Sequence, residues 1–532
     1  MKPRRKDGYH AVAWQEPIIL EMGTPGERGV LLPPAGEGIT RVVGDVLESI
    51  PADIRRRNPP RLPELSQPQV LRHYLRLSQM SLGADLNLDI SQGTCTMKYS
   101  PKVNERLVSM PELTELHPYQ DVDTVQGVLE VMYRFESILK AVSGMDRFTF
   151  QPGGGAQGIY TNACIIRAYH ESRGQANQRT EIITTIFSHP ADAACPATAG
   201  FKVITLYPDG RGYPDLDALK AAVSERTAGL MITNPEDTGV FNPRIREFVD
   251  LVHAAGGLCA YDQANANGIL GVTRAREAGF DMCHFNLHKT FSSPHGSSGP
   301  ASGAVGVINE LARFLPVPTL EFDGDKHYLD YDRPETIGKV RGFHGNVPAV
   351  VRAYAWVMSL GAKGLRLVAD TSVLNNNYMA MKMAAIPGVA IAYPEARARL
   401  DQIRYSWEPL KRKTGVGTED VRRRMVDFGL QSYFESHHPW VVPEPFTLEP
   451  DETYSKDDID EYVEVMRHIS DEAHSSPEIV LGAPHQSTIS RIDESALDDP
   501  KRWAMTWRAH LRKRSGTEPM RVTLPSISEP GR

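Results

Sequence analysis

The sequence predicts an α/β protein in which a large domain, built on a mostly parallel sheet, precedes a smaller α+β domain. Between residues 147 and 308, short apolar runs alternate with stretches of helical periodicity, as expected when helices cover both faces of a parallel sheet. From about residue 349, one long helical stretch is followed by shorter strands and helices. The length of 532 residues is sufficient for two or three domains.

The composition excludes several classes of protein. Hydrophobic residues make up 41% and charged residues 23% of the chain, and the formal net charge is −7. These values are typical of a globular enzyme and give no reason to expect a nucleic-acid partner. No apolar run is long enough to span a bilayer, and no signal-peptide segment follows the basic start. We therefore expect a cytoplasmic protein without a membrane partner.

The cysteines indicate neither a metal site nor a disulfide scaffold. Their number is odd, no close pair has the spacing of zinc ligands, and a chain of this length can bury a sufficient core without disulfides. We therefore expect no metal. The five residues are Cys95, Cys164, Cys195, Cys259 and Cys283.

The two ends of the chain differ from its middle. Residues 1–65 are rich in Pro, Gly and Arg and have little periodicity, so we predict an extended arm that lies on other surfaces. The basic cluster at 55–57 is interpreted as a solvated face. We predict a large domain over 66–345, a small C-terminal domain over 346–495 and a tail over 496–532. The Pro/Ser-rich part of the tail from Ser515 is expected to be disordered.

Two helices of the large domain follow from periodicity and from the residues that flank them. Apolar residues at 125, 128, 129, 132, 135, 139 and 142 recur at helical spacing. Asp121 or Asp123 can cap this helix, and Gly144 can end it. A second helix begins at Asn242 and Pro243 and extends to residue 253.

The remaining elements are one long helix and a series of strands. The helix covers 349–383 and is interrupted by Gly361 and Gly364. The predicted strands cover 147–151, 181–187, 202–206, 229–233, 258–261, 282–286 and 304–308.

Three features at predicted strand ends point to chemistry. Asp262 follows the strand 258–261, and Lys289 follows the strand 282–286. The carboxyl ends of parallel strands form the crevice in which such sheets bind ligands, and a lysine there can form an imine with a carbonyl group. The run 151–158 (QPGGGAQG) lies between a strand and a helix, where glycines let backbone N–H groups approach a phosphate.

Each of these features alone has an ordinary explanation. The glycine run could be a turn or a nucleotide loop, a single lysine is usually a surface residue, and Asp262 could cap a helix. Together they match pyridoxal phosphate (PLP), which needs a phosphate site, a lysine for its aldehyde and a carboxylate that keeps its pyridine nitrogen protonated. We therefore predict PLP as the cofactor.

His189 is a further candidate for the site. It follows the strand 181–187 and precedes a stretch of small residues. Its ring could stack on the pyridine face, or it could be a histidine with satisfied hydrogen bonds at a strand end. The choice depends on the other three features.

Five strings, found in this order, carry a resemblance to a known family. They are 93–99 (GTCTMKY), 117–120 (HPYQ), 151–158 (QPGGGAQG), 262–265 (DQAN) and 286–291 (NLHKTF), the last followed by Pro294, His295 and Gly296. From about residue 65 to about residue 495, the chain resembles the P-protein of the glycine cleavage system, glycine dehydrogenase (decarboxylating). Its length and the position of its lysine resemble subunit 2 of the two-chain form. The resemblance implies the aspartate-aminotransferase-like PLP-dependent transferase fold, fold type I.

The resemblance also implies a role for each site residue. Lys289 would be the catalytic residue that holds PLP, Asp262 would meet the pyridine nitrogen, and His189 would stack on the ring. The other implied cofactor contacts are Gly154, Gly155, Ala156 and Gln157 at the phosphate, Ala264 under the ring, and His288 and Thr290 along the site.

The implied reaction is PLP-dependent decarboxylation of glycine, with transfer of the aminomethyl group to the lipoyl arm of H-protein. The implied partner chain is subunit 1, a homologous chain without the lysine, which completes the active site across an interface in a heterotetramer. Glycine and lipoylated H-protein are the other implied partners.

The chain departs from the family pattern near the site. Asp192-Ala193 stands where the family usually has Asn-Pro, and Glu236-Asp237 stands where it usually has a Ser/Asn-Thr pair. If Asp192 or Asp237 faced the substrate in its charged form, it would repel a substrate carboxylate. Two smaller departures are Gln263 in place of a glycine and the pair Ser297-Ser298, which breaks a glycine run.

These departures leave two alternatives open. One is another fold-type-I PLP decarboxylase or lyase that acts alone, in which Cys95 could be a nucleophile. The other is a PLP-binding scaffold subunit, against which the intact Lys289 and Asp262 argue.

Overall fold

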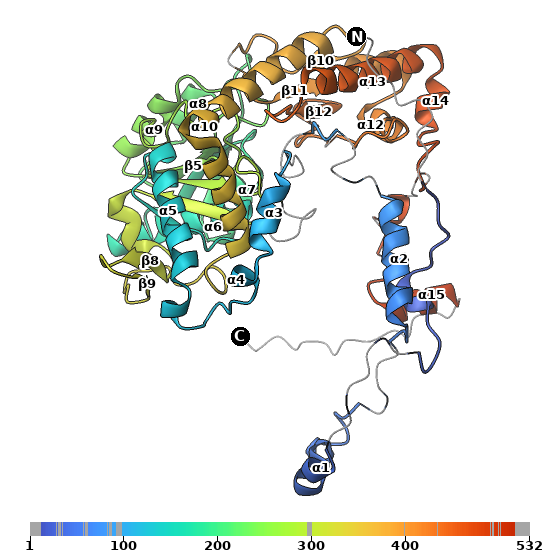
Figure 1. Ribbon diagram of the computed structural model, residues 1–532. Coiled ribbons are helices and arrows are strands. Elements are labelled where there is room, and N and C mark those ends of the chain that lie inside the picture. The colour runs from blue at the N-terminus through green and yellow to red at the C-terminus, as the bar shows by residue number, and fades with distance from the viewer. Residues whose placement is uncertain are drawn as a thin grey trace, which may run out of the picture. The chain divides into compact units, whose positions relative to one another are not determined.

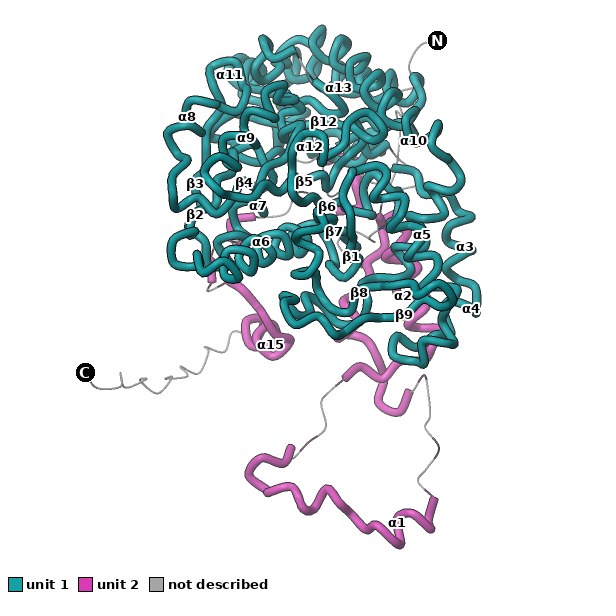
Figure 2. Tube along the Cα trace, turned by 90° about the vertical axis from the view of Figure 1, so that its left-hand side faces the viewer, with its two compact units in different colours: residues 1–8, 83–483 teal, residues 9–82, 484–532 magenta. Residues whose placement is uncertain are grey.

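The computed structural model describes residues 12–515 except for 28, 30–32, 34–35, 57, 59–61, 82, 84–87, 92–97, 295–300, 398, 434, 490, 492–493, 498 and 501. Cys95, His295, Gly296, Ser297, Ser298 and the end of the predicted tail therefore lie outside the described residues. The chain divides into two compact units, residues 1–8 with 83–483 and residues 9–82 with 484–532 (Figure 2). The domain boundaries proposed at residues 65, 345 and 495 stay predictions.

The first unit contains a seven-stranded sheet in the order β1-β7-β6-β5-β4-β2-β3. Its strands are β1 (Arg147–Thr149), β2 (Glu181–Thr185), β3 (Lys202–Leu206), β4 (Thr227–Thr233), β5 (Leu258–Asp262), β6 (Met282–Asn286) and β7 (Gly303–Val307). Strands β2 to β6 pair in parallel, and β7 runs antiparallel to both β6 and β1. The predicted, mostly parallel sheet is confirmed. Between β6 and the antiparallel strand β7, the described residues 287–294 and 301–302 contain no helix.

Helices cover both faces of this sheet (Figure 1). On one face lie α5 (Gln126–Ser143), α8 (Leu216–Ala222), α9 (Ile245–Ala254) and α10 (Val347–Met383), whose apolar residues join Leu230 and Ile232 of β4 in one core. On the other face lie α6 (Gly155–Ser172) and α7 (Ala191–Thr198), which share a core with Met231. Successive residues of β4 therefore face opposite helices, as a strand buried on both faces requires.

The long helix α10 leads from the large sheet into a smaller α+β part. It is interrupted at Gly361, which has a φ of 63°, as predicted, whereas Gly364 remains helical. The smaller part has an antiparallel sheet of β10 (Ala390–Ile391), β11 (Ile403–Ser406) and β12 (Pro445–Leu448). The end of α10 packs with this sheet and with α11 (Glu408–Thr414), α12 (Thr418–Val426), α13 (Lys456–Ser475) and α14 (Pro477–Leu481) in a separate core.

The other elements of the first unit are short. They are α3 (Lys102–Val108), α4 (Pro111–Thr114), the 3-10 helices η4 (Val122–Thr124) and η5 (Asn309–Phe314), and the hairpin of β8 (Thr319–Phe322) and β9 (His327–Asp330). Within the described residues, no helix has both the length and the apolar character needed to cross a membrane.

The second unit contains mostly isolated helices. They are η1 (Ile19–Glu21), α1 (Glu37–Val43), η2 (Val46–Ser49), α2 (Gln67–Gln79), η6 (Glu494–Ala496) and α15 (Trp507–Arg514). Ser66 and Gln69 form a capping box at the start of α2, a motif that satisfies the free N–H groups of a helix. Nδ1 of His73 in α2 lies 2.8 Å from Oε1 of Glu16. Among the described residues of this unit, only Leu65 and His73 are buried.

Candidate active site

The large sheet brings the predicted site residues together at the carboxyl ends of three neighbouring strands. Asp262 ends β5, pairing with Thr233 of β4 on one side and with His284 of β6 on the other. Lys289 lies in the turn that follows β6. It is close enough to Asp262 and His189 to interact with both electrostatically. The fold thus assembles Lys289, Asp262 and His189 into one site.

Asp262 is buried and keeps one oxygen available. Its Oδ1 accepts a hydrogen bond from the backbone N–H of Ala264 at 2.8 Å and lies 3.3 Å from Nε2 of His284. Its Oδ2 is also buried but accepts no hydrogen bond from any described residue. Burial alone would raise the pKa of Asp262, but the neighbouring His284 and His189 outweigh this effect and lower it. A buried, ionised carboxylate with a free oxygen suits a protonated pyridine nitrogen.

Lys289 is buried, with 9% of its surface exposed. Its turn is held by hydrogen bonds from Lys289 N to Asn286 O at 3.1 Å and from Ser292 N to Lys289 O at 3.0 Å. Among the residues that the structure describes, none forms a hydrogen bond or an ion pair with Nζ. A buried amine without a partner is costly, so the arrangement suits a lysine that bonds to a cofactor.

The other predicted residues near Lys289 mainly hold backbone segments in place. Nδ1 of His288 lies 3.1 Å from the carbonyl oxygen of Ser302. Oγ1 of Thr290 accepts a hydrogen bond from Ala266 N at 2.8 Å, next to Ala264. The Thr290 contact connects the segment after β6, which carries Lys289, to the segment after β5, and the His288 contact connects it to the start of β7.

The glycine run forms an open helix start. Gly154 precedes α6, whose N-terminus has no side-chain cap, so its first N–H groups, at Gly155, Ala156 and Gln157, suit an anion. A Cβ on Gly155 would lie 2.7 Å from Nδ2 of Asn286, so a larger residue there would displace the Asn286 side chain. The Gln157 side chain braces the run: Oε1 accepts from Gly153 N at 2.6 Å, and Nε2 donates to the Val340 carbonyl at 2.5 Å.

Two hydrogen bonds, one of its backbone N–H and one of its ring, hold His189 just before α7. Its N–H donates to Oγ1 of Thr233 at 3.3 Å, and its Nδ1 accepts from Ala191 N at 3.1 Å. Burial lowers the pKa of His189, and the charge of Lys289 adds to this effect. The imidazole is therefore neutral near neutral pH, with its proton on Nε2.

Burial raises the pKa of two of the three acidic residues that depart from the family pattern. Oδ2 of Asp192 accepts a hydrogen bond from Oγ1 of Thr233 at 3.2 Å. Burial, and then the charge of Asp262, raise the pKa of Asp192 well above its usual value. Oε1 of Glu236 accepts from Oγ1 of Thr185 at 2.5 Å, and burial raises the pKa of Glu236 to about 8.

The third acidic residue, Asp237, is ionised and is paired with Arg404 and His437. Its Oδ2 lies 3.3 Å from Nη2 of Arg404 and 3.0 Å from Nδ1 of His437. Burial would raise the pKa of Asp237, but the hydrogen bond to His437 and the charge of Arg404 lower it. The departures therefore do not place uncompensated negative charge beside Lys289.

Four residues of the site were not predicted. His284 and Asn286 alternate along β6, so they share a face of the strand, and this spacing could have indicated them. Arg404 of β11 and His437, which lies before β12, belong to the smaller sheet region, and no local pattern marks them.

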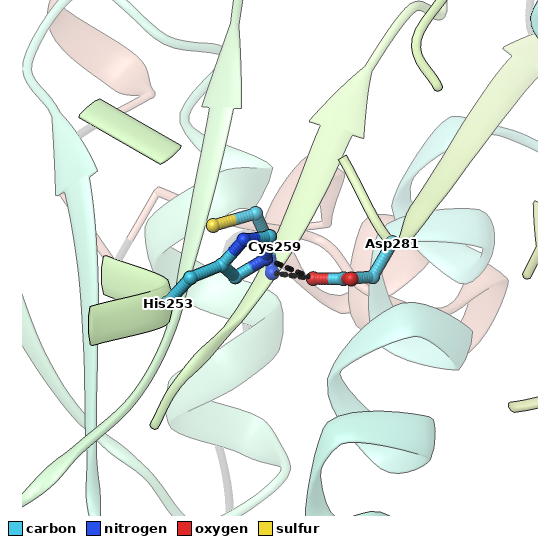
Figure 3. A group of neighbouring side chains, drawn as sticks. All are labelled: His253, Cys259 and Asp281. Atoms are coloured by element: carbon cyan, nitrogen blue, oxygen red, sulfur yellow. Dashed lines mark hydrogen bonds and ion pairs between the residues drawn. The ribbon is translucent and has the colours of Figure 1, made fainter. Parts of the chain in front are cut away.

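A separate group of His253, Cys259 and Asp281 lies at the opposite ends of the strands. Figure 3 shows the Cys259 sulfur pointing away from the Asp281 carboxylate. Oδ2 of Asp281 accepts instead from Cys259 N at 2.8 Å and lies 2.8 Å from Nε2 of His253. The group joins the end of α9 to the starts of β5 and β6, and its geometry is that of a structural contact.

Solved structures share this fold. The glycine decarboxylase (P-protein) of the glycine cleavage system, in inhibitor-bound form, is similar with a TM-score of 0.69 at 19% identity, covering 82% of this chain and 100% of that chain. A NifS-like protein is similar with a TM-score of 0.54 at 16% identity, covering 70% of this chain and 96% of that chain. Residues 153–324 match the family Aminotransferase class-V.

Sequence relatives cover nearly the whole chain. It is 45% identical over 507 residues to a probable glycine dehydrogenase (decarboxylating) subunit 2 from Pyrococcus abyssi, covering 94% of this chain and 98% of that protein. It is 42% identical over 486 residues to the protein of that name from Halalkalibacterium halodurans, covering 90% of this chain and 96% of that protein. Residues 368–485 match the family Glycine dehydrogenase, C-terminal domain.

The fold and the site together define a PLP-dependent enzyme of fold type I. Within that class, the chain belongs to the glycine dehydrogenase (decarboxylating) subunit 2 family. The family, the fold type, the PLP cofactor and the glycine-decarboxylating enzyme class predicted from the sequence are thereby confirmed.

Proposed function

We propose that this chain is the PLP-carrying subunit of a two-chain glycine decarboxylase, with Lys289 as the residue that holds PLP. The observation that carries the proposal is a buried lysine without a described partner, next to Asp262, whose buried Oδ2 is available. Asp262 would hold the pyridine nitrogen and His189 would cover the ring. The phosphate would lie at the start of α6, at Gly154, Gly155, Ala156 and Gln157, while Ala264, His288 and Thr290 would shape the remaining wall.

Each residue has a defined task in this proposal. PLP, when bound, accepts the electron pair left behind as carbon dioxide departs from the substrate. Asp262, whose pKa is lowered by neighbours that include the Ala264 N–H and Lys289, would hold the pyridine nitrogen of PLP in its protonated form. Lys289 would hold the cofactor, and its Nζ is the group that could move a proton at the substrate carbon. His189 covers one ring face and excludes water from it.

The electrostatics of the site support an amino-acid substrate with a free carboxylate, such as glycine. Burial raises the pKa of Asp192 and of Glu236, which favours their neutral forms, and Asp237 is paired with Arg404 and His437. A negatively charged substrate therefore meets no uncompensated carboxylate among these three residues.

The proposed partners are subunit 1, a homologous chain without the lysine, and a lipoylated H-protein that receives the aminomethyl group, in the cytoplasm. The second unit supports a partner chain, because only two of its described residues are buried and several large apolar side chains are exposed, among them Leu71, Tyr74 and Leu75. Apolar side chains that gather on an exposed surface are typical of protein–protein contacts.

The first experiment tests the cofactor site. Borohydride reduction of the protein with bound PLP should fix the cofactor on Lys289, as found by peptide mapping. Lys289→Ala should retain weak PLP binding and lose the fixed cofactor, whereas Lys202→Ala, at an exposed lysine, should behave like the wild type. Label on another lysine would refute the assignment.

The second experiment tests the reaction and the partners. Incorporation of labelled bicarbonate into glycine should be weak with this chain alone and should rise when subunit 1 and lipoylated H-protein are both present. Robust turnover of another amino acid by the isolated chain would favour the stand-alone decarboxylase or lyase suggested by the acidic departures. Tight PLP binding without turnover under any combination would favour the scaffold alternative.

A further inference from the structure

His437 connects the smaller sheet region to the proposed cofactor site. It lies between α12 and β12, and its ring contacts the ring of His189 edge-on, with the ring centroids 5.7 Å apart and the ring planes at 76°. His189 lies at the start of α7, next to Asp262 and Lys289. A residue that sequence reasoning did not indicate thus touches the residue proposed to cover the PLP ring.

The orientation of His437 is set by a buried anion. Its Nδ1 lies 3.0 Å from Oδ2 of Asp237. Because Asp237 is ionised, it accepts the Nδ1 proton of His437, and the ring can no longer turn freely. The Nδ1 side of the His437 ring is therefore held against Asp237.

Arg404 in turn holds Asp237. Its guanidinium group is fully buried, and Nη2 lies 3.3 Å from the same Oδ2 of Asp237. Its Nε donates to Oγ1 of Thr447 at 3.2 Å, and its guanidinium carbon lies 5.3 Å from the centre of the Phe187 ring. Arg404 is thus fixed by two strands of the smaller sheet, β11 and β12, and by the segment that leads to His189.

His189 is fixed from its other side by the backbone. Its Nδ1 accepts from Ala191 N at 3.1 Å. The ring therefore has one hydrogen bond at Nδ1 and one ring contact, to His437, which together determine its tilt. Edge-to-face ring pairs have a preferred geometry and a measurable stabilisation.

We propose that His437 is a positioning residue that holds His189 in the orientation needed to cover the PLP ring, with Asp237 and Arg404 as its supports. The inference rests on the role given to His189 in the proposed function. The position of the smaller sheet region against the large sheet would then affect how tightly the chain binds PLP.

The test uses the full-length chain without substrate, titrated with PLP. The two readouts are the dissociation constant of PLP and the absorption band of the bound cofactor, which a purely structural role would not shift. His437→Leu should weaken PLP binding roughly two- to ten-fold, the range expected for an aromatic pair, and shift the band. His437→Phe keeps a ring against His189 and should restore most of the affinity. Asp237→Asn should shift the band in the same direction as His437→Leu, by less.

The control is His468→Leu. His468 also packs edge-on against an aromatic ring, that of Phe428 at 5.4 Å, and pairs with a carboxylate, Glu472, at 3.1 Å. This variant should match the wild type in both readouts.

Two outcomes would overturn the inference in distinguishable ways. If His189→Leu shifts both readouts but His437→Leu does not, His189 covers the ring without help from His437. If His189→Leu itself leaves both readouts unchanged, the stacking role in the proposed function is wrong, and the role of His437 falls with it.

Discussion

Nζ of Lys98 lies 2.8 Å from Oε1 of Glu452, an ion pair between side chains that are only 2% and 14% exposed. The ammonium group also lies 4.8 Å from the centre of the Trp356 ring in α10. The contact connects the segment before α3 to the segment after β12. The lysine of the Thr-Met-Lys string thus has a structural task, holding the start of the first unit against its smaller sheet region.

Lys98→Met should destabilise the protein strongly. Removing one partner leaves Glu452 as a largely buried, unpaired charge, and breaking such a pair costs about 3–5 kcal/mol. Urea unfolding of the cofactor-free chain would measure the loss. Lys456→Met is the control, because the Lys456 side chain is 68% exposed and its partner Asp460 keeps an ion pair with Lys382, so this change should affect stability little. Equal losses in both variants would contradict a special role for Lys98.

Asp262→Asn and Asp192→Asn should differ sharply, although both remove a buried carboxyl group. The pKa of Asp262 is lowered, so this carboxyl group is ionised, whereas burial raises the pKa of Asp192 and favours its neutral form. Losing a charge-assisted hydrogen bond costs about 1.5–3 kcal/mol, so Asp262→Asn should lower turnover far more than PLP occupancy. Asp192→Asn replaces one neutral group with another and should keep most of the turnover. Turnover and PLP occupancy should be measured for both variants. Comparable losses of turnover in the two would mean that Asp192 is charged.

Glu236→Gln should alter how stability depends on pH. Burial raises the pKa of Glu236 in the folded protein to about 8, from an ordinary value of 4.5, so the folded state holds a proton that the unfolded chain has released. Stability therefore falls as pH rises from about 4.5 to about 8 and levels off above that range. Glu236→Gln keeps an oxygen for the Thr185 hydroxyl and should remove this part of the slope.

The measurement is urea unfolding at a series of pH values across that window. Glu310→Gln, at an exposed glutamate, should retain the wild-type slope. A Glu236→Gln profile parallel to that of the wild type would show that Glu236 is ionised in the folded protein.

The sequence was sufficient to place Asp262 and Lys289 because apolar runs mark the strands and each residue directly follows one. The same local reasoning could not foresee that the Gln157 side chain braces Gly153, since that use depends on the carbonyl of Val340, far along the chain. Gly361 and Gly364 are equivalent by residue type, yet only Gly361 breaks α10.

The network of Asp237, Arg404 and His437 was beyond sequence reasoning for a further reason. Its three members belong to a loop after β4, to β11 and to the segment before β12, and only the packing of the two sheet regions brings them together. Considered alone, the carboxylate of Asp237 would be expected to repel the carboxylate of the substrate. Its actual electrostatic effect depends on Arg404 and His437, which no spacing in the sequence connects to it.

The exposed face of α2 should be part of the interface with subunit 1. Leu71, Tyr74 and Leu75 are 61%, 55% and 53% exposed, and positions i, i+3 and i+4 lie on one face of a helix. The opposite side of α2 is used within the unit, where Glu16 contacts His73 and Arg76. An apolar helix face left exposed in a unit with almost no core is expected to be covered by a partner.

The double variant Leu71→Lys, Leu75→Lys should therefore weaken association with subunit 1 by roughly ten-fold or more, since a few central apolar residues dominate most interfaces. Sedimentation velocity of mixtures of the two chains would measure this. PLP fixation on Lys289 in the isolated chain should be unchanged, because the substitutions lie in the second unit. Arg72→Gln, at an exposed position of the same helix, serves as the control and should associate normally. If the double variant also associates normally, the apolar face of α2 lies outside the interface, and the partner must be held by the first unit alone.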